Sequence, residues 1–306
     1  MFHRFTSARS RYVWTGIFSF VCVSLCAGNA FAQILYWSEG GFGAGVIKRA
    51  DLRNLEASET IVTADHAISV LALDDRRNKL YWTGDGLLQR STLNGDEIET
   101  LSSGFGFSEG LALDPSADAL YWSTWSGTLR RAALDGTGES IVFTDFQQLF
   151  GLALDSASSQ LYWTAGDTGI YRGDIDGANQ EFLVDGGSEP LGIVLDFAHQ
   201  RMYWTDWLGM SVWGANLDGS QREQIYTSEF GNPIGITLDP SEGSLYWTEW
   251  GTNAIMRAAI DGSGVEQLGV MVGTPWGIQL APIPAPGAFV LLIAVAAFSV
   301  SRRRAL

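Results

Sequence analysis

The sequence has little cysteine and histidine, and part of what it has lies outside its central region. Both cysteines, Cys22 and Cys26, fall in an apolar N-terminal segment, so a chain that loses this segment has no disulfide, thiolate nucleophile or cysteine metal site. Of the three histidines, only His66 and His199 lie in the central region, which removes most of the side chains of acid–base and zinc chemistry. We therefore predict no catalytic constellation, no metal site and no cofactor.

Basic residues are also scarce. The chain of 306 residues has 19 Lys and Arg against 34 Asp and Glu, and six of the basic residues lie near the two ends, where there is no acid. The region between them therefore holds the other 13 basic residues and all 34 acidic ones, a net charge of −21. A region this negative repels phosphate backbones and anionic lipid headgroups, so we expect no nucleic acid among the partners.

Residues 1–32 have the pattern of a cleaved secretory signal peptide. A basic start is followed by an apolar run from Ile17 to Leu25 and by the small-residue triplet 30–32 before Gln33. The run is short for a membrane span, although an uncleaved anchor is the alternative. The pattern predicts an exported protein that begins at Gln33.

Residues 282–306 form a second terminal segment. Three prolines precede an apolar run over 288–300, and the arginines at 302–304 follow it. The apolar run would enter a membrane, and the arginine cluster after it would stay on the cytoplasmic side. This order predicts that the segment tethers the protein to a membrane, at least transiently. It also resembles the PEP-CTERM sorting tail of bacterial exosortase substrates, with Ala285 where that family usually has Glu. The resemblance implies an exosortase-type sorting peptidase as a partner; a plain membrane anchor is the alternative.

The central region is a repeat. A Tyr-Trp pair preceded by Leu or Met recurs at intervals of 45, 40, 41, 41 and 43 residues. A Gly-rich apolar motif ending in Asp precedes each pair after the first, and an apolar-x-Arg motif leading to Asn-Gly or Asp-Gly follows most of them. Such dipeptides between apolar runs favour tight hairpins. The tyrosines of the six pairs are Tyr36, Tyr81, Tyr121, Tyr162, Tyr203 and Tyr246.

Four short strands in about forty residues correspond to one blade of a β-propeller. The central region begins at the second strand of its first repeat, and an unpartnered first strand occurs at its far end, over 275–280. We therefore predict an all-β, six-bladed propeller over 33–281, with four-stranded blades, in which the C-terminal strand completes the N-terminal blade. The repeated Tyr and Trp rings are expected in the core, and the repeated arginines in blade packing or on the strand surface rather than in a phosphate clamp.

These motifs resemble the class B, or YWTD, repeat of the low-density lipoprotein receptor family, a six-bladed β-propeller, over essentially all of 34–281. The fourth position of the motif, Asp in YWTD, departs from that pattern. Asp206 alone keeps the aspartate, and Glu39 and Glu249 are near substitutes. The other three repeats have Gly84, Thr124 and Ala165. The resemblance implies that this acid locks neighbouring blades. Cysteine-rich modules, which those receptors carry, are absent from the sequence, so endocytic receptor function does not carry over.

The residues that enter each first strand and leave each second strand should line one mouth of the ring. They are rich in aromatic rings and carboxylates, and in the resembled family this face binds extended, often basic, protein segments. Trp anchors in acidic surroundings fit such a partner. The predicted ligand-binding face consists of Glu39, Glu109, Trp125, Phe150, Asp206, Trp207, Glu249, Trp250 and Trp276.

The sequence thus predicts a cell-surface, outer-envelope or extracellular binding module for an unidentified protein or peptide ligand. One alternative is a propeller hydrolase or lyase with a metal in the central channel, for which Glu109 is the one acid at the start of a first strand. Another alternative is a purely structural surface or matrix protein.

Overall fold

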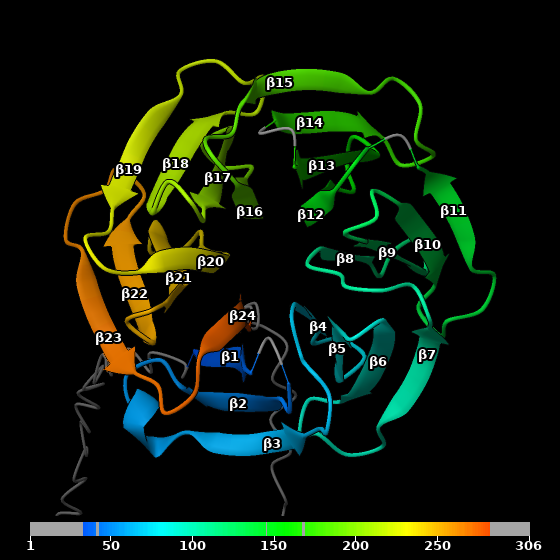
Figure 1. Cartoon of the computed structure of the whole chain (residues 1–306), viewed down its shortest axis with the longest axis horizontal. Coiled ribbons are helices and arrows are strands. Elements are labelled where there is room, and N and C mark those ends of the chain that lie inside the picture. Colours follow the sequence, from blue (N-terminus) through cyan, green and yellow to red (C-terminus); the bar gives the residue numbers. More distant parts are fainter. Residues whose placement is uncertain (1–32, 41–42, 145, 167–168, 282–306) are drawn as a thin grey trace, which may run out of the picture. The chain divides into compact units, whose positions relative to one another are not determined.

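The computed structural model describes residues 33–40, 43–144, 146–166 and 169–281, which form a ring of six four-stranded sheets around a central axis (Figure 1). The predicted signal peptide and sorting tail lie outside the described residues. Each sheet is one blade, and its first strand in the order given below lies nearest the axis. The predicted six-bladed propeller is confirmed.

Consecutive strands pair antiparallel within each blade. Blade 1 consists of β24 (Pro275–Leu280), β1 (Ile34–Glu39), β2 (Val46–Asp51) and β3 (Glu59–Thr63), with a short 3-10 helix, η1 (Leu55–Ala57), before β3. Blade 2 consists of β4 (Leu71–Asp74), β5 (Lys79–Gly84), β6 (Leu87–Thr92) and β7 (Glu99–Ser103). Blade 3 consists of β8 (Leu111–Asp114), β9 (Ala119–Ser123), β10 (Leu129–Ala133) and β11 (Ser140–Phe143).

The second half of the ring repeats this pattern. Blade 4 consists of β12 (Leu149–Asp155), β13 (Gln160–Ala165), β14 (Gly169–Asp174) and β15 (Glu181–Asp185). Blade 5 consists of β16 (Pro190–Asp196), β17 (Arg201–Asp206), β18 (Ser211–Asn216) and β19 (Glu223–Thr227). Blade 6 consists of β20 (Asn232–Asp239), β21 (Ser244–Trp250), β22 (Ala254–Ala259) and β23 (Glu266–Val270).

The ring closes as the sequence predicts. Strand β24, from the C-terminal end of the propeller, pairs antiparallel with β1, from Leu35 opposite Leu280 to Glu39 opposite Pro275. Without this pairing, β1 would present an open edge to solvent, which sheet proteins avoid.

Aromatic rings of the repeated Tyr-Trp pairs fill the space between blades. All six tryptophans of these pairs are at most 1% exposed, and their tyrosines at most 3%. The two rings face opposite sides of their strand, because successive side chains of a strand alternate, so each blade contributes one large ring to either neighbour. In one such cluster Tyr81 of blade 2 packs with Trp122 of blade 3. The prediction that these rings form the core is confirmed.

A hydroxyl after each Tyr-Trp pair ties its blade to the next one. The Thr205 hydroxyl accepts a hydrogen bond from the Gly192 N–H of its own blade and donates one to the main-chain oxygen of Ile234 in blade 6, at 2.6 Å. The same donation occurs in every blade, to a main-chain oxygen in the inner strand of the next blade or just before that strand. The donors are Ser38, Thr83, Ser123, Thr164, Thr205 and Thr248, and the respective acceptors are Ser69, Ser108, Phe150, Leu191, Ile234 and Trp276.

Glycine in the inner strands permits this close approach. A Cβ atom on Gly151 would lie 2.2 Å from the main-chain oxygen of Leu191 in the next blade, which no real side chain tolerates. The repeated Gly therefore sets the width of the channel by allowing neighbouring inner strands to pack backbone against backbone.

The repeated arginines pack between blades. Arg90 on β6 donates to the main-chain oxygen of Leu134 in blade 3 at 2.7 Å, and Arg172 on β14 donates to that of Leu217 in blade 5 at 3.3 Å. Blade 5 has Gly214 opposite its repeat tyrosine, and there Arg201, two residues before Tyr203 on the same strand β17, lies over the tyrosine ring. The predicted role in blade packing is confirmed for Arg90 and Arg172.

Candidate functional site

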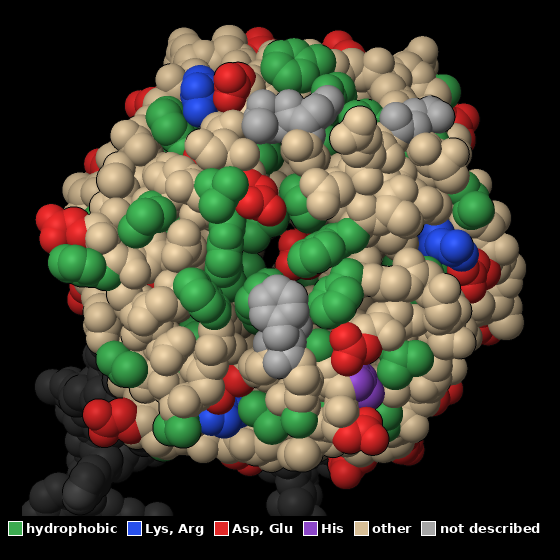
Figure 2. Space-filling model, viewed as in Figure 1, with side chains coloured by type: hydrophobic (Ala, Val, Ile, Leu, Met, Phe, Trp, Pro, Cys, Tyr) green, Lys and Arg blue, Asp and Glu red, His purple; other side chains and the backbone are tan. Residues whose placement is uncertain are grey.

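The starts of the inner strands gather at one mouth of the channel. There, Phe150, Leu191, Ile234 and Trp276, from four different blades, form one buried apolar cluster, against which Trp125 and Trp207 pack. Viewed from this side, hydrophobic and acidic side chains surround the central opening (Figure 2). Four of the aromatic residues that the sequence assigns to the mouth, Trp125, Phe150, Trp207 and Trp276, are thus brought together.

The mouth tryptophans contact one another in an arc. The ring centroid of Trp207 lies 5.4 Å from that of Trp250 and 6.1 Å from that of Trp276, and on the other side Trp125 meets Phe150 edge to face at 6.3 Å. Trp250 is 43% exposed, whereas Trp276 is buried. The arc therefore runs from a buried floor to an accessible edge.

The main chain around these rings is fixed. The N–H of Trp207 donates to the main-chain oxygen of Glu189 at 2.9 Å, and its carbonyl accepts from the Asn232 side chain at 2.8 Å. Trp125 stands at the equivalent position of blade 3, and its N–H donates in the same way to Phe107. The main chain of both tryptophans is thus held by residues that precede or begin the inner strands, which favours a preformed site.

Two carboxylates belong to the mouth itself. Glu109 and Glu189 line one cavity together with the indoles of Trp125, Trp207 and Trp276. The Oε2 atom of Glu109 is fully enclosed. Burial raises the pKa of the Glu109 carboxyl to about 7; the charge of Glu189 adds to this rise, and the nearby indole N–H groups of Trp125 and Trp276 oppose it. Burial, followed by the charge of Asp206, also raises the pKa of Glu189.

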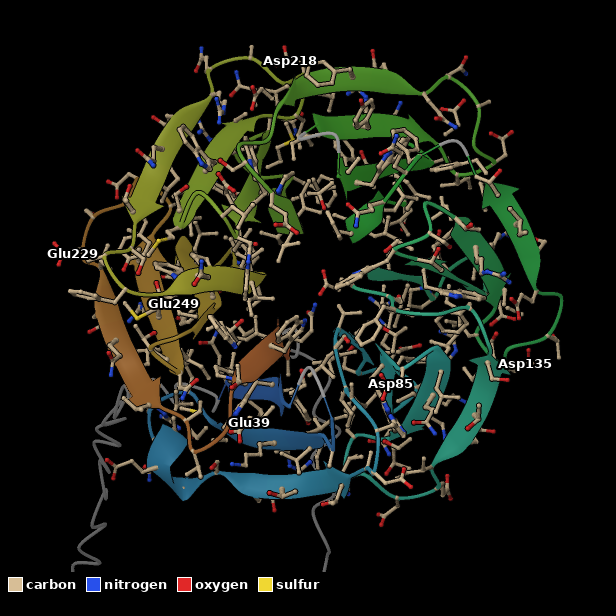
Figure 3. All side chains as sticks on the ribbon, viewed as in Figure 1. Glu39, Asp85, Asp135, Asp218, Glu229 and Glu249 are labelled. Atoms are coloured by element: carbon tan, nitrogen blue, oxygen red, sulfur yellow. The ribbon has the colours of Figure 1, made fainter. Side chains whose placement is uncertain are left out.

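The other three predicted carboxylates are turned away from the opening. Glu39, Asp206 and Glu249 are 5%, 2% and 1% exposed, and Figure 3 shows Glu39 and Glu249 set back from the axis. The main chain places these residues at the mouth side of their blades, but the carboxylates point into their own blades. They therefore add no accessible charge to the mouth.

These buried acids secure the loops that cross from one blade to the next. Asp206 accepts hydrogen bonds from the N–H groups of Ser188 and Glu189 at 3.0 and 2.8 Å, in the loop between β15 and β16. Glu39 accepts from Gly273 in the loop before β24 and pairs with Lys48. The lock between blades that the resemblance implied is thus present where the acid is present.

The repeats that lack this acid differ from one another. In blade 2 the next residue, Asp85, accepts from the N–H of Ala67 at 2.9 Å and so holds the corresponding loop. In blade 3, Thr124 accepts from the N–H of Thr128 and is tied to Ser126, so it stabilises its own turn. In blade 4, the N–H of Gly166 donates to the main-chain oxygen of Gln148.

Outside the arc, apolar side chains project into solvent on the loops of the same face. Leu208, Phe230 and Val272 are 61%, 77% and 96% exposed, and Trp250, the accessible end of the arc, is exposed as well. We call these four residues the apolar rim. Exposed apolar side chains gathered beside a cavity are typical of protein interaction surfaces.

The described part of the chain contains no group of three or more His, Cys, Asp or Glu side chains placed to hold a metal ion. None of its helices has the length and apolar character needed to cross a membrane.

Sequence reasoning missed Glu189 as a mouth residue and the hydroxyls as links between blades. Glu189 stands two residues before Leu191, in a loop with no repeated motif, so only the three-dimensional arrangement reveals it. The hydroxyls were visible as the Thr or Ser that follows every Tyr-Trp pair. That invariance within the chain could have indicated a shared structural role.

The fold and the repeat together define a class: the protein is a six-bladed β-propeller built from Tyr-Trp repeats. The sequence of blade 5 identifies the kind of repeat, since residues 200–240 match the model of the low-density lipoprotein receptor repeat class B. No curated protein sequence matches the chain.

Solved structures share the fold. A chain in the crystal structure of a nidogen/laminin complex superposes with a TM-score of 0.73 at 22% identity, over 82% of this chain and 99% of that one. A putative TolB from Agrobacterium tumefaciens superposes with a TM-score of 0.62 at 14% identity, over 83% of this chain and all of that one. At these identities the likeness concerns the fold.

Proposed function

We propose that this propeller is an exported binding module whose mouth recognises an extracellular protein or peptide ligand rich in basic side chains. The observation that carries the proposal is the combination, on one face, of a preformed aromatic arc, two carboxylates without a basic partner in the cavity, and the apolar rim. Large rigid rings supply contact area at low entropic cost, and uncompensated acids favour a cationic partner.

The comparisons support a binding role in general terms. The superposed nidogen chain comes from a complex with laminin, so that propeller has a protein partner. The enzyme alternative has less support, because the described residues offer no metal-binding group and Glu109 is accompanied in its cavity by one acid and apolar side chains.

Selection from a random peptide library on the immobilised full-length protein would test the proposal. We expect the enriched peptides to be rich in Lys and Arg, and to lose binding when Trp207 and Trp250 are both changed to Ala. A matched control is Phe182→Ala, which removes an exposed aromatic ring from the outer strand β15. Peptides that bind the double variant as well as the unaltered protein would place the ligand elsewhere and contradict the proposal.

We also propose that residues 1–32 direct export and that residues 282–306 hold the propeller at the cell surface or are processed there. The order of motifs in each segment supports this. Mass spectrometry of the mature protein tests both parts. A mature N-terminus at Gln33 is expected, and cleavage before Arg302 distinguishes a sorting tail from a plain anchor. A mature protein that retains residues 1–32 would contradict the export signal.

A further inference from the structure

A small cavity lies at the floor of the mouth, between the aromatic arc and the channel. Its volume is about 120 Å³, and its lining consists of Glu109, Trp125, Glu189, Leu191, Trp207 and Trp276. This volume corresponds to a few water molecules, so the cavity has room for a compact head group of a few heavy atoms. We call it the floor pocket.

The floor pocket has negative charge without a built-in counter-charge. Two of its six lining residues are acids and none is basic. The Glu109 Oε2 atom is fully enclosed, and the groups that favour its charged form are the indole N–H groups of Trp125 and Trp276, which carry no full positive charge. An enclosed carboxylate left in this state costs free energy, which a bound cation would offset.

The remaining walls suit a cation of low polarity. Three indoles border the pocket, and the electron-rich face of an indole attracts an organic cation. Hydrogen-bond acceptors, by contrast, are few, because the side chains that line the pocket besides the two acids are Leu and Trp. A guanidinium carries N–H groups around its whole edge and would turn some of them toward the apolar walls, whereas an ammonium that carries methyl groups presents apolar surface to those walls.

We propose that the floor pocket binds a methylated ammonium group, held by the indoles of Trp125, Trp207 and Trp276 and by the carboxylate of Glu109. The group could belong to a free small quaternary amine or to a methylated amine on a protein. This inference deepens the proposed function. It rests on that function in one respect, that ligands bind at the mouth of the channel. It concerns one head group, whereas the apolar rim would contact the rest of a larger ligand.

A pair of ligands that differ only in charge tests the inference. Choline and its carbon isostere 3,3-dimethylbutan-1-ol have the same shape, so isothermal titration of the full-length protein with each measures the contribution of the cation. We expect choline to bind at least about tenfold more tightly, as charge recognition by aromatic rings and a carboxylate implies. Equal binding of the two, or binding of neither, would overturn the inference.

Variants locate the site. Glu109→Gln keeps the shape of the side chain and should lower choline affinity at least about tenfold while leaving binding of the isostere unchanged. The control is Glu229→Gln, an exposed acid in the loop between β19 and β20, which should leave both affinities unchanged. Circular dichroism of each variant confirms folding. A folded Glu109→Gln protein that binds choline normally would refute the assignment.

Two further arms separate the sources of the head group and the two proposals. A peptide with one trimethyllysine should bind more tightly than choline and lose affinity in Phe230→Ala on the apolar rim, whereas choline should not respond to that variant. Choline binding without a peptide advantage indicates a free amine as ligand. A further outcome is that basic peptides bind through the apolar rim while choline and its isostere bind equally. That result would refute methylammonium binding in the floor pocket and leave the proposed function in place.

Discussion

The hydroxyl of Thr248 donates a hydrogen bond to the main-chain oxygen of Trp276 at 2.6 Å, and through it blade 6 is joined to the inner strand of blade 1. The same hydroxyl accepts from the N–H of Gly235 at 3.0 Å, so one buried side chain satisfies two main-chain groups in different blades. Trp276 is also part of the aromatic cluster at the mouth. The closure of the ring and the position of a candidate binding residue therefore depend on the same contact.

Replacing Thr248 by Val should lower the free energy of unfolding by about 1–3 kcal/mol, because it leaves two buried main-chain groups without a partner. Chemical denaturation with tryptophan fluorescence measures this change. Thr63→Val is the control, since Thr63 is exposed on the outer strand β3 and should change stability by less than about 0.5 kcal/mol. Equal effects at the two positions would show that the hydroxyl has no linking role.

A chain that ends before Pro275 should lose cooperative unfolding. It would expose the edge of β1 and leave a gap in the ring, since β24 is the inner strand of blade 1. Differential scanning calorimetry compares this chain with one that ends after Ala281, which keeps the described propeller entire. A single sharp transition of unchanged midpoint in the shorter chain would contradict the role given to β24.

Glu109→Gln should stabilise the protein increasingly as pH rises. The Glu109 carboxyl has a pKa of about 7 in the folded state against 4.5 as its ordinary value, so the folded chain holds the proton more tightly than the unfolded one. Stability of the unaltered protein therefore falls as pH rises from 4.5 to about 7. The gain from Gln should be close to zero below this range and reach at most about 3 kcal/mol above it.

Denaturation midpoints of both proteins, measured across this pH range, give the comparison. The acid that faces Glu109 is Glu189, whose own pKa is raised by burial and by the charge of Asp206. Glu229→Gln, at an exposed position, controls for the general loss of one negative charge. A stability difference that does not vary with pH would show that Glu109 titrates normally.

Asp206→Asn should loosen the loop between β15 and β16. The carboxylate accepts from three N–H groups, those of Ser188, Glu189 and Gly209, whereas an amide offers a single acceptor oxygen. We expect faster hydrogen exchange of the amides at 188 and 189 and a loss of about 1–3 kcal/mol in stability. Asp218→Asn, in an exposed turn, is the control. Unchanged exchange at both amides would exclude the lock.

Binding of basic peptides should weaken as salt rises. The mouth acids act on a cationic ligand partly through solvent, and ions screen such interactions over about 10 Å at 0.1 M salt. Titrations of one selected peptide at several concentrations of sodium chloride measure the effect, with an uncharged peptide of similar affinity as the control. Affinity that is independent of salt would leave only the aromatic surface as the basis of recognition.

The repeat was enough to predict the fold, including its closure. The six Tyr-Trp pairs mark the second strand of every blade. The first blade lacked an inner strand in the sequence order, and the unpartnered strand at 275–280 could supply it. Equivalent positions also placed Trp125, Trp207 and Trp250 at the mouth, since each stands four residues after its repeat tyrosine. Period and strand order fix these main-chain positions because blades differ little in length.

Side-chain direction could not be predicted in the same way. Glu39, Asp206 and Glu249 stand at the correct end of their strands, but all three carboxylates are buried. Loop N–H groups hold those of Glu39 and Asp206, and the hydroxyls of Ser228 and Thr252 hold that of Glu249. Such donors are invisible in a sequence, because a loop's N–H directions depend on its φ and ψ angles. Glu189 was missed for the same reason, and it became apparent only where its loop meets Trp207.

The antiparallel pairing of β24 with β1 also determines at which face of the propeller the described chain begins and ends. Pro275 begins β24 at the mouth, and Ala281 follows its end, where its N–H donates to Ile34 at 2.9 Å. The first and last described residues are thus neighbours on the face opposite the mouth. A propeller tethered through the residues after 281 would display its mouth outward, with a single point of attachment that leaves the binding face unobstructed.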